Sequence, residues 1–212
     1  MARGYCAENP RILEIGAGPD NATSEYLSGL GHLVGIDPSS EVKNNRCLNE
    51  AYIMNDDVFP CSSESFDSCL SNYVLEHVSN PRSHFEEVRR VLKPGGVYCF
   101  RTPNLFHYVA LTARLTPHWF HNLVANRLRS LSPESHDPYP TIYRSNSEST
   151  LRELARSVGF TVVELRLIEK EPSYGAVSPI LFYPMLAYER FVNSADRYRW
   201  LRANIIGVFR KD

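Results

Sequence analysis

The sequence predicts an α/β fold in which a mostly parallel sheet carries helices on both of its faces. Short apolar runs alternate with helical patterns through the first half of the chain, and this order is typical of a parallel sheet. The 212 residues suffice for one ordinary domain. Hydrophobic residues make up 43% of the chain and charged residues 22%, a balance that excludes a wholly disordered chain and a coiled coil.

Five short apolar runs in the first half have the length of buried strands. They are Arg11–Gly16, His32–Asp37, Ala51–Asn55, Phe66–Asn72 and Gly96–Thr102. The link between the third and fourth runs is too short for a full helix, so we expect a loop or a single turn there.

Two helices are expected between these strands. The first is Asn21–Leu30, and the second is Pro81–Leu92, where apolar residues recur at helical spacing beside charged ones. Asn80 is a suitable cap before a proline at the first helical position. The run KPGG at residues 93–96 supplies a basic last turn and then ends the helix.

The second half of the chain predicts one helix and two strands. The helix is Ser145–Val158, which Gly159 closes, and the strands are Thr161–Ile168 and Ala203–Phe209.

Longer irregular segments separate these elements. We therefore expect a single domain over residues 1–212, with insertions at about 103–143 and 170–200 that together form a cover over the substrate.

Composition narrows the class of protein. The 23 basic and 24 acidic residues leave a net charge of -1 and an isoelectric point of about 6.7, which disfavours nucleic acid as a partner. The five cysteines are scattered, without a CxxC pair, as in a reduced protein without disulfides or metal. Neither a signal core nor an apolar run of about 20 residues is found. We expect a cytoplasmic protein.

The run ILEIGAGPDN at residues 12–21 reads as a strand, a glycine turn and the start of a helix. A dinucleotide site prefers a small third residue in G-x-G-x-x-G, and Asn21 occupies that position. Glu14 lies two residues before the first glycine, where a carboxylate would repel a pyrophosphate and attract a cation. The loop therefore favours a ligand with positive charge and no phosphate.

Acidic residues stand at the ends of three consecutive strands, and Glu14 is the one on the first strand. Asp37 follows the second strand, 19 residues beyond Gly18, where a carboxylate can accept both hydroxyls of a ribose. Asp56 and Asp57 follow the third strand, where a carboxylate can accept the amine of an adenine. Because ligands of open α/β sheets bind outside the carboxyl ends of the strands, the three positions together indicate a binding site.

The segments LEIGAGPDNATSEYL, GIDPS, NDD, ESFDSCLSNYVLEHVSNP and RVLKPGG resemble class I S-adenosylmethionine-dependent methyltransferases, and most closely those of ubiquinone and menaquinone biosynthesis. The resemblance covers about residues 11–103, and more loosely 145–168 and 203–210. It implies a Rossmann-like fold with seven strands in the order 3-2-1-4-5-7-6, the last strand antiparallel. It also implies S-adenosylmethionine as cofactor, with S-adenosylhomocysteine as product.

The resemblance assigns a set of residues to the cofactor. Glu14 would lie near the methionine amino group, Asp37 would bind the ribose, and either Asp56 or Asp57 would bind the adenine. The full set implied is Glu14, Gly16, Ala17, Gly18, Asn21, Asp37, Pro38, Asp56, Asp57, Val58, Ser71 and Asn72.

The chain departs from the family pattern in two places. Asp20 stands where the third small residue of GxGxG is usual, so the loop must differ locally. Only ten residues precede Arg11, and the helices that cover the cofactor in relatives are absent from them. We expect the segment 103–143 to take over as the cover.

A hydroxyl acceptor needs a base near neutral pKa, and histidine is the natural choice. His77 follows the fourth strand and His107 follows the fifth, so both are candidate bases. The segment Thr102-Pro103-Asn104 differs from the signature of enzymes that methylate planar amines. We expect O-methylation of a small molecule, such as a sugar, a lipid-linked or a quinone-like metabolite.

Alternatives remain open. Arginines exceed acidic residues over 114–144, which fits either an anionic acceptor or a solvated surface. The apolar stretch 177–192 could pack on its own domain, line a pocket, form a homodimer face or lie on a bilayer. A methyltransferase for protein or nucleic acid, an inactive cofactor-binding regulatory module, and a nicotinamide dehydrogenase are the competing functions.

Overall fold

The computed structural model describes residues 9–55, 58–108, 110–111, 139–169 and 179–212. The chain divides into two compact units. The first comprises Met1–Thr102, Ile142–Arg166 and Ile206–Asp212, and the second comprises Pro103–Thr141 and Leu167–Ile205. The predicted adenine ligands Asp56 and Asp57 lie outside the described residues, as does most of the segment 103–143.

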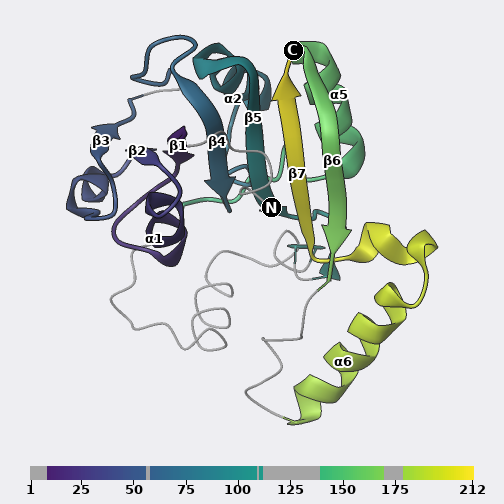
Figure 1. The fold of residues 1–212 in the computed structure, drawn as a ribbon. Helices are drawn as coiled ribbons and strands as arrows, with labels where there is room; N and C mark the ends of the chain where they lie inside the picture. Colours follow the sequence, from purple (N-terminus) through teal and green to yellow (C-terminus); the bar gives the residue numbers. More distant parts are fainter. Residues whose placement is uncertain (1–8, 56–57, 109, 112–138, 170–178) are drawn as a thin grey trace. The chain divides into compact units, whose positions relative to one another are not determined.

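Seven strands form a single sheet in the order β3-β2-β1-β4-β5-β7-β6, as the sequence predicts (Figure 1). The strands are β1 (Arg11–Ile15), β2 (His32–Asp37), β3 (Glu50–Ile53), β4 (Phe66–Asn72), β5 (Leu92–Pro103), β6 (Phe160–Ile168) and β7 (Asn204–Lys211). The pairs β1–β2, β1–β4, β2–β3 and β4–β5 are parallel. The arrow of β7 runs opposite to those of β5 and β6 in Figure 1, which confirms the antiparallel last strand.

Three helices begin and end close to the predicted residues, namely α1 (Ala22–Ser28), α2 (Pro81–Val91) and α5 (Glu148–Val158). A further helix is α6 (Pro179–Asn193), and short 3-10 turns span Ser40–Asn44 and Asp196–Leu201. The Asn80 side chain accepts a hydrogen bond from the backbone N–H of Ser83, which confirms the expected cap of α2. Gly159 closes α5 with a φ of 85°, a conformation that glycine adopts without cost.

The strand β5 begins earlier than the sequence predicts. It starts at Leu92, directly after α2, because Leu92 already has extended backbone angles and pairs with Phe66. The register then shifts between Phe66 and Ser68, so the Pro94-Gly95-Gly96 run is accommodated as an irregularity within the strand. The glycines therefore lie inside a bulged strand and do not precede it.

The helix α6 lies in the second unit and was not predicted as a helix. Its interior contains Pro184, a residue that removes a backbone donor and usually ends a helix. Ile180 and Tyr183 on this helix are 83% and 68% exposed. In the part of the chain that the structure describes, no helix is both long enough and apolar enough to cross a membrane.

An aromatic core in the first unit holds α2 against the sheet. Phe85 of α2 contacts Tyr98, Phe100, Phe160 and Phe209, with ring centroids 5.7 to 6.5 Å apart. The aromatic side chains cover one face of the sheet. The polar side chains of interest lie on the opposite face and at the carboxyl ends of the strands.

Candidate functional site

The carboxyl ends of β1, β2 and β4 bring together several of the predicted cofactor residues. Ile15 pairs with Ile36 of β2 on one side and with Ser71 of β4 on the other, so the three strands end side by side. The glycine loop follows β1 at this edge, and Asp37 is the last residue of β2. The edge is also where the strand order reverses between β1 and β4, the position at which open α/β sheets bind ligands.

The glycine loop is tied to the end of β2. The backbone N–H groups of Gly16 and Ala17 both donate to the carbonyl of Ile36, and the N–H of Gly18 donates to Asp37 Oδ2 at 3.0 Å. Gly16 and Gly18 have φ values of 73° and 55°, a region in which residues with a Cβ are strained. The two glycines are therefore required by the path of the loop.

Glu14 is a buried carboxyl group at the foot of this loop. It is 3% exposed and accepts a hydrogen bond from Ser24 Oγ at 2.7 Å. Burial raises the pKa of Glu14 from its ordinary value of 4.5 to about 7, the Ser24 hydrogen bond opposes that rise, and the charge of Asp37 adds to it. Among the described residues no cation pairs with Glu14. A buried carboxylate in this state is suited to a cationic ligand.

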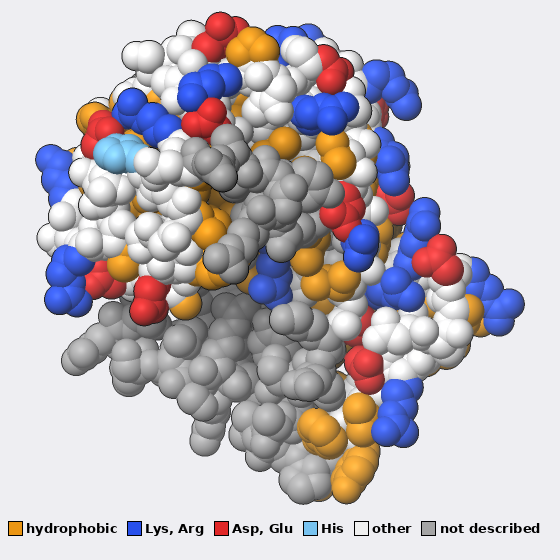
Figure 2. All heavy atoms as spheres, in the orientation of Figure 1, with side chains coloured by type: hydrophobic (Ala, Val, Ile, Leu, Met, Phe, Trp, Pro, Cys, Tyr) orange, Lys and Arg blue, Asp and Glu red, His pale blue; other side chains and the backbone are white. Residues whose placement is uncertain are grey.

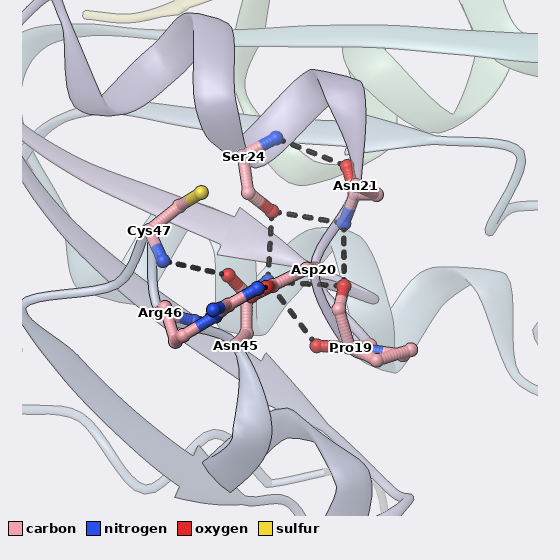
Figure 3. Close-up of polar contacts among 8 residues, drawn as sticks. Pro19, Asp20, Asn21, Ser24, Asn45, Arg46 and Cys47 are labelled. Atoms are coloured by element: carbon pink, nitrogen blue, oxygen red, sulfur yellow. Dashed lines mark hydrogen bonds and ion pairs between the residues drawn. The ribbon is translucent and has the colours of Figure 1, made fainter.

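Two asparagine side chains fix the loop and orient Ser24 (Figure 3). Asn21 Nδ2 donates to the carbonyls of Ala17 and Pro19 and to Ser24 Oγ. Asn45 Nδ2 donates to Ser24 Oγ at 2.9 Å and to the carbonyl of Pro19. Because a hydroxyl has two acceptor sites and one proton, the two amides fill the acceptor sites, and the proton of Ser24 is directed to Glu14.

Asp20, the departure from the family pattern, is held from outside the loop. Its carboxylate accepts the backbone N–H of Arg46 at 2.6 Å and pairs with the Arg46 guanidinium at 2.7 Å (Figure 3). The Arg46 backbone and side-chain hydrogen bonds lower the pKa of Asp20. The φ of Asp20 is not positive, so this position does not demand a glycine.

Asn45 was not among the residues predicted from the sequence, and its replacement tests how the loop is held. Asn45→Ala should lower the free energy of unfolding by about 2 kcal/mol, because it removes a donor from Ser24 Oγ and from the carbonyls of Gly18 and Pro19. Arg46→Ala should have a much smaller effect, because the Arg46 side chain is exposed. Urea unfolding of both variants measures their free energies of unfolding. Equal losses of free energy in the two variants would show that the loop is held mainly by Arg46.

Asp37 presents a carboxylate that is already anchored by backbone groups. Oδ2 accepts from Gly18 N, and Oδ1 accepts from Ser39 N at 2.7 Å. Each oxygen of a carboxylate keeps a further acceptor site, so a diol can still bind both. The neighbouring Pro38 is exposed, and Val58 is 63% exposed beyond the end of β3.

Ser71 and Asn72 project to opposite faces of the sheet, as successive residues of a strand do. Asn72 is exposed, and its Nδ2 donates to Thr23 Oγ1 of α1 at 3.1 Å. The Ser71 side chain is buried and shares a hydrogen bond of 2.6 Å with the Tyr98 hydroxyl. Tyr98 also contacts His84, whose pKa burial lowers from 6.5 to about 4. Of the two predicted residues, only Asn72 extends its side chain on the face of Glu14.

The two candidate bases lie in different units. His77 is half-buried in the first unit, and its backbone N–H donates to the carbonyl of Val74. His107 is buried in the second unit, with Nε2 3.5 Å from Glu169 Oε2 and its ring against Tyr108 and Tyr188. Burial lowers the pKa of His107 from 6.5 to about 4, so it is neutral at physiological pH.

Glu76 is a titratable group that the sequence reasoning missed. It is 4% exposed, just past the end of β4, and its carboxyl accepts from Thr102 Oγ1 at 3.1 Å. Asn146 Nδ2 in turn donates to Thr102 Oγ1 at 2.6 Å. Burial raises the pKa of Glu76 from 4.5 to about 7. The sequence signal that could have identified Glu76 is its position between the apolar residue Leu75 and the candidate base His77.

Comparisons with known proteins agree with this geometry. A family profile described as "Methyltransferase domain" matches residues 2–165. An uncharacterized methyltransferase of Schizosaccharomyces pombe is 28% identical over 123 residues, which are 48% of this chain and 42% of the relative. The demethylmenaquinone methyltransferase of Tropheryma whipplei is 33% identical over 104 residues, which are 45% of this chain and 44% of the relative. The chain spans about two-fifths of the length of these relatives.

The fold is also found among solved structures. A SAM-dependent methyltransferase of Methanosarcina mazei superposes with a TM-score of 0.63 at 18% sequence identity, over 99% of this chain and 96% of that one. Since the family profile spans well over half of the sequence, the chain belongs to the methyltransferase-domain family, and the family and fold predicted from the sequence are confirmed.

Proposed function

We propose that this chain transfers a methyl group from S-adenosylmethionine to an oxygen atom of a small-molecule acceptor. The observation that carries the proposal is the buried carboxyl group of Glu14. Two glycines with positive φ, Gly16 and Gly18, follow it in the chain, and Asp37 at the end of β2 accepts a hydrogen bond from Gly18. A carboxyl group that has no cationic partner among the described residues fits the ammonium of the cofactor. The anchored Asp37 carboxylate fits the ribose hydroxyls, as in other nucleoside sites of this topology.

The residues around the loop would position the cofactor, whose sulfonium supplies an already activated methyl group. The positive φ of Gly16 and Gly18 lets the backbone approach a ligand closely. The amides of Asn21 and Asn45 keep the loop carbonyls occupied and hold Ser24 against Glu14. Methyl transfer of this kind depends mainly on proximity and orientation, so a rigid loop is the main contribution of the chain.

A hydroxyl acceptor also needs a base, and three residues are candidates. His77 and His107 are the two that the sequence suggested. The pKa of about 7 gives Glu76 the proton affinity that a base needs at neutral pH, whereas the pKa of about 4 makes His107 a weak base. We favour Glu76 or His77, which follow the same strand and belong to the unit that contains the glycine loop.

The acceptor class rests on two supports. One relative is named a demethylmenaquinone methyltransferase, which supports a quinone-like acceptor; a sugar or a lipid-linked metabolite remains in the same class of small molecules. Basic and acidic side chains are intermixed among the coloured residues of the face drawn in Figure 2, and those residues form no broad surface of a single sign such as nucleic acid binding requires. The alternatives are a methyltransferase for macromolecules and a binding module without activity.

Calorimetric titration with S-adenosylmethionine, S-adenosylhomocysteine and NAD is the test of this function. We expect micromolar binding of the two adenosyl ligands and no binding of NAD. Asp37→Ala should weaken binding of both adenosyl ligands by about tenfold or more, because hydrogen bonds to a charged group are lost. Glu25→Ala, an exposed acidic residue in the first turn of α1, serves as the control and should not change the affinity.

Binding alone does not establish catalysis. Incubation with cofactor carrying an isotopically labelled methyl group, and with panels of phenols, quinols and sugars, should label a small molecule at oxygen. Adenosyl binding without any transfer to these panels or to protein would favour the regulatory module. NAD binding in place of adenosyl binding would contradict the proposal.

A further inference from the structure

Arg101, at the carboxyl end of β5, is a cation that has no counter-ion among the described residues. Its Nε is buried, and among the described residues its guanidinium has neither a hydrogen-bond acceptor nor a carboxylate partner. Arginine is always protonated, and leaving a buried charged donor unpaired is unfavourable. The carboxyl groups of Glu14 and Glu76 already accept hydrogen bonds from other side chains, Glu14 from Ser24 and Glu76 from Thr102.

Tyr73 is held against this guanidinium in a strained conformation. The Arg101 guanidinium carbon lies 4.6 Å from the centroid of the Tyr73 ring, within the range of a cation–π contact. The backbone N–H of Tyr73 donates to the carbonyl of Arg101 at 2.8 Å, and Tyr73 has a φ of 58°. A bulky residue in the left-handed region is uncommon and costs about 1 kcal/mol or more. Strain of this kind is concentrated at functional sites.

The strand register places Arg101 on the face of the sheet that carries the cofactor residues. Glu14 pairs with Leu70, and Asn72, two residues further along β4, pairs with Arg101. Because paired residues of parallel strands project to the same face and alternate residues do so too, Glu14, Asn72 and Arg101 share one face. Asn72 contacts α1 on that face through Thr23.

We propose that Arg101, supported by Tyr73, binds an anionic oxygen group of the methyl acceptor, a carboxylate or a phosphate. The planar guanidinium can donate two parallel hydrogen bonds to such a group, and the Tyr73 ring orients its plane. The acceptor is then a small anionic molecule whose hydroxyl is methylated. This inference rests on the proposed function, since it assigns a substrate class to the same edge of the sheet.

Phenyl phosphate is the probe, titrated into wild-type protein saturated with S-adenosylhomocysteine, with neutral phenol as its uncharged counterpart. We expect saturable binding of phenyl phosphate to the wild type. Binding to Arg101→Met should be at least about tenfold weaker, because the charge-assisted hydrogen bonds of the guanidinium are lost. Arg101→Lys keeps the positive charge but loses the planar pair of N–H donors, so its affinity for phenyl phosphate should be intermediate. Phenol should not distinguish the variants. Arg82→Met, which removes an exposed arginine of α2, is the charge-matched control.

The affinity for S-adenosylhomocysteine is measured first in every variant and should stay within about twofold of wild type. A large loss of that affinity in Arg101→Met would assign the guanidinium to the carboxylate of the cofactor and overturn the proposal. Equal phenyl phosphate binding by wild type, Arg101→Met and Arg101→Lys, or none by the wild type, would also overturn it. Failure of the wild type to bind S-adenosylhomocysteine contradicts the proposed function instead, and phenyl phosphate titrated into the unliganded protein then decides the anion site.

Discussion

Replacing Glu14 with glutamine should make the unliganded protein more stable at alkaline pH while it weakens cofactor binding by about 100-fold, the loss expected when a buried charge pair is removed. Glutamine keeps an oxygen that can accept the Ser24 hydrogen bond, so the loop should retain its shape. What it removes is the ionised carboxylate, which burial disfavours in the absence of a cation. Stability and binding therefore change in opposite directions in one variant.

The pH range of the stability gain follows from the direction of the pKa shift. Glu14 has a pKa of about 7 in the folded protein and an ordinary value of 4.5 when unfolded. Between these values the folded state holds a proton that the unfolded state has released, so the contribution of Glu14 to stability is full below 4.5 and is lost as pH rises through 7. Glu14→Gln should match wild type near pH 4 and exceed it by about 3 kcal/mol near pH 8.

Urea unfolding at several pH values, compared with calorimetric titration of S-adenosylhomocysteine, measures both effects. The difference between wild type and variant isolates Glu14 from Glu76 and from the buried histidines, which titrate in the same range in both proteins. Glu25→Gln makes the same chemical change at an exposed position of α1 and should alter neither quantity. A variant that loses affinity without gaining alkaline stability would show that Glu14 is already ionised in the unliganded protein.

The same group predicts that wild-type affinity depends on pH. An ammonium beside Glu14 favours its ionised form, so below about pH 7 binding must release a proton and the affinity should fall as the solution is acidified. Calorimetric titrations of S-adenosylhomocysteine in buffers with different ionisation enthalpies measure how many protons are released on binding. Glu14→Gln should abolish this release.

Local sequence patterns were sufficient to predict most of the fold. The caps at Asn80 and Gly159, and the alternation of strands and helices, each depend on residues close in sequence, and the structure confirms them. The helix α6 was missed because Pro184 disfavours a helix locally, and in the structure the helix nevertheless continues through this residue. The early start of β5 was missed because the pairing of Leu92 with Phe66 is not visible in either segment alone.

The candidate site was less predictable because its key contacts join distant segments. Asn45 is 21 residues from Ser24 and 26 residues from Pro19, and no spacing rule connects an asparagine in a short turn to a glycine loop. The raised pKa of Glu76 likewise depends on its burial in the folded chain, where Thr102 of β5 donates to it and Asn146, just before α5, donates to Thr102. Motif reasoning identifies residues that approach the ligand, whereas the residues that hold them in place emerge only from the folded chain.

Gly16 offers the sharpest test of whether the loop is as rigid as the site requires. Gly16→Ala should lower the free energy of unfolding by about 3 kcal/mol, from the left-handed backbone and from overpacking together. A Cβ at Gly16 would lie 2.5 Å from Val74 Cγ2, and valine is stiff about its first side-chain torsion. Gly18→Ala is the matched control, because its φ is also positive but no atom lies within 4 Å of the added carbon, so only about 1 kcal/mol is expected.

The double variant Gly16→Ala/Val74→Ala separates the two costs. Val74→Ala removes the methyl group that the new Cβ would meet, so the double-mutant cycle should show a favourable coupling of about 1 to 2 kcal/mol. The backbone strain at Gly16 should remain, and with it a weakened affinity for S-adenosylhomocysteine, because the N–H groups of Gly16 and Ala17 anchor the loop to Ile36. Equal destabilisation by Gly16→Ala and Gly18→Ala, with no coupling to Val74, would mean that the loop yields to the added carbon, and rigid positioning of the cofactor by this loop would then have to be abandoned.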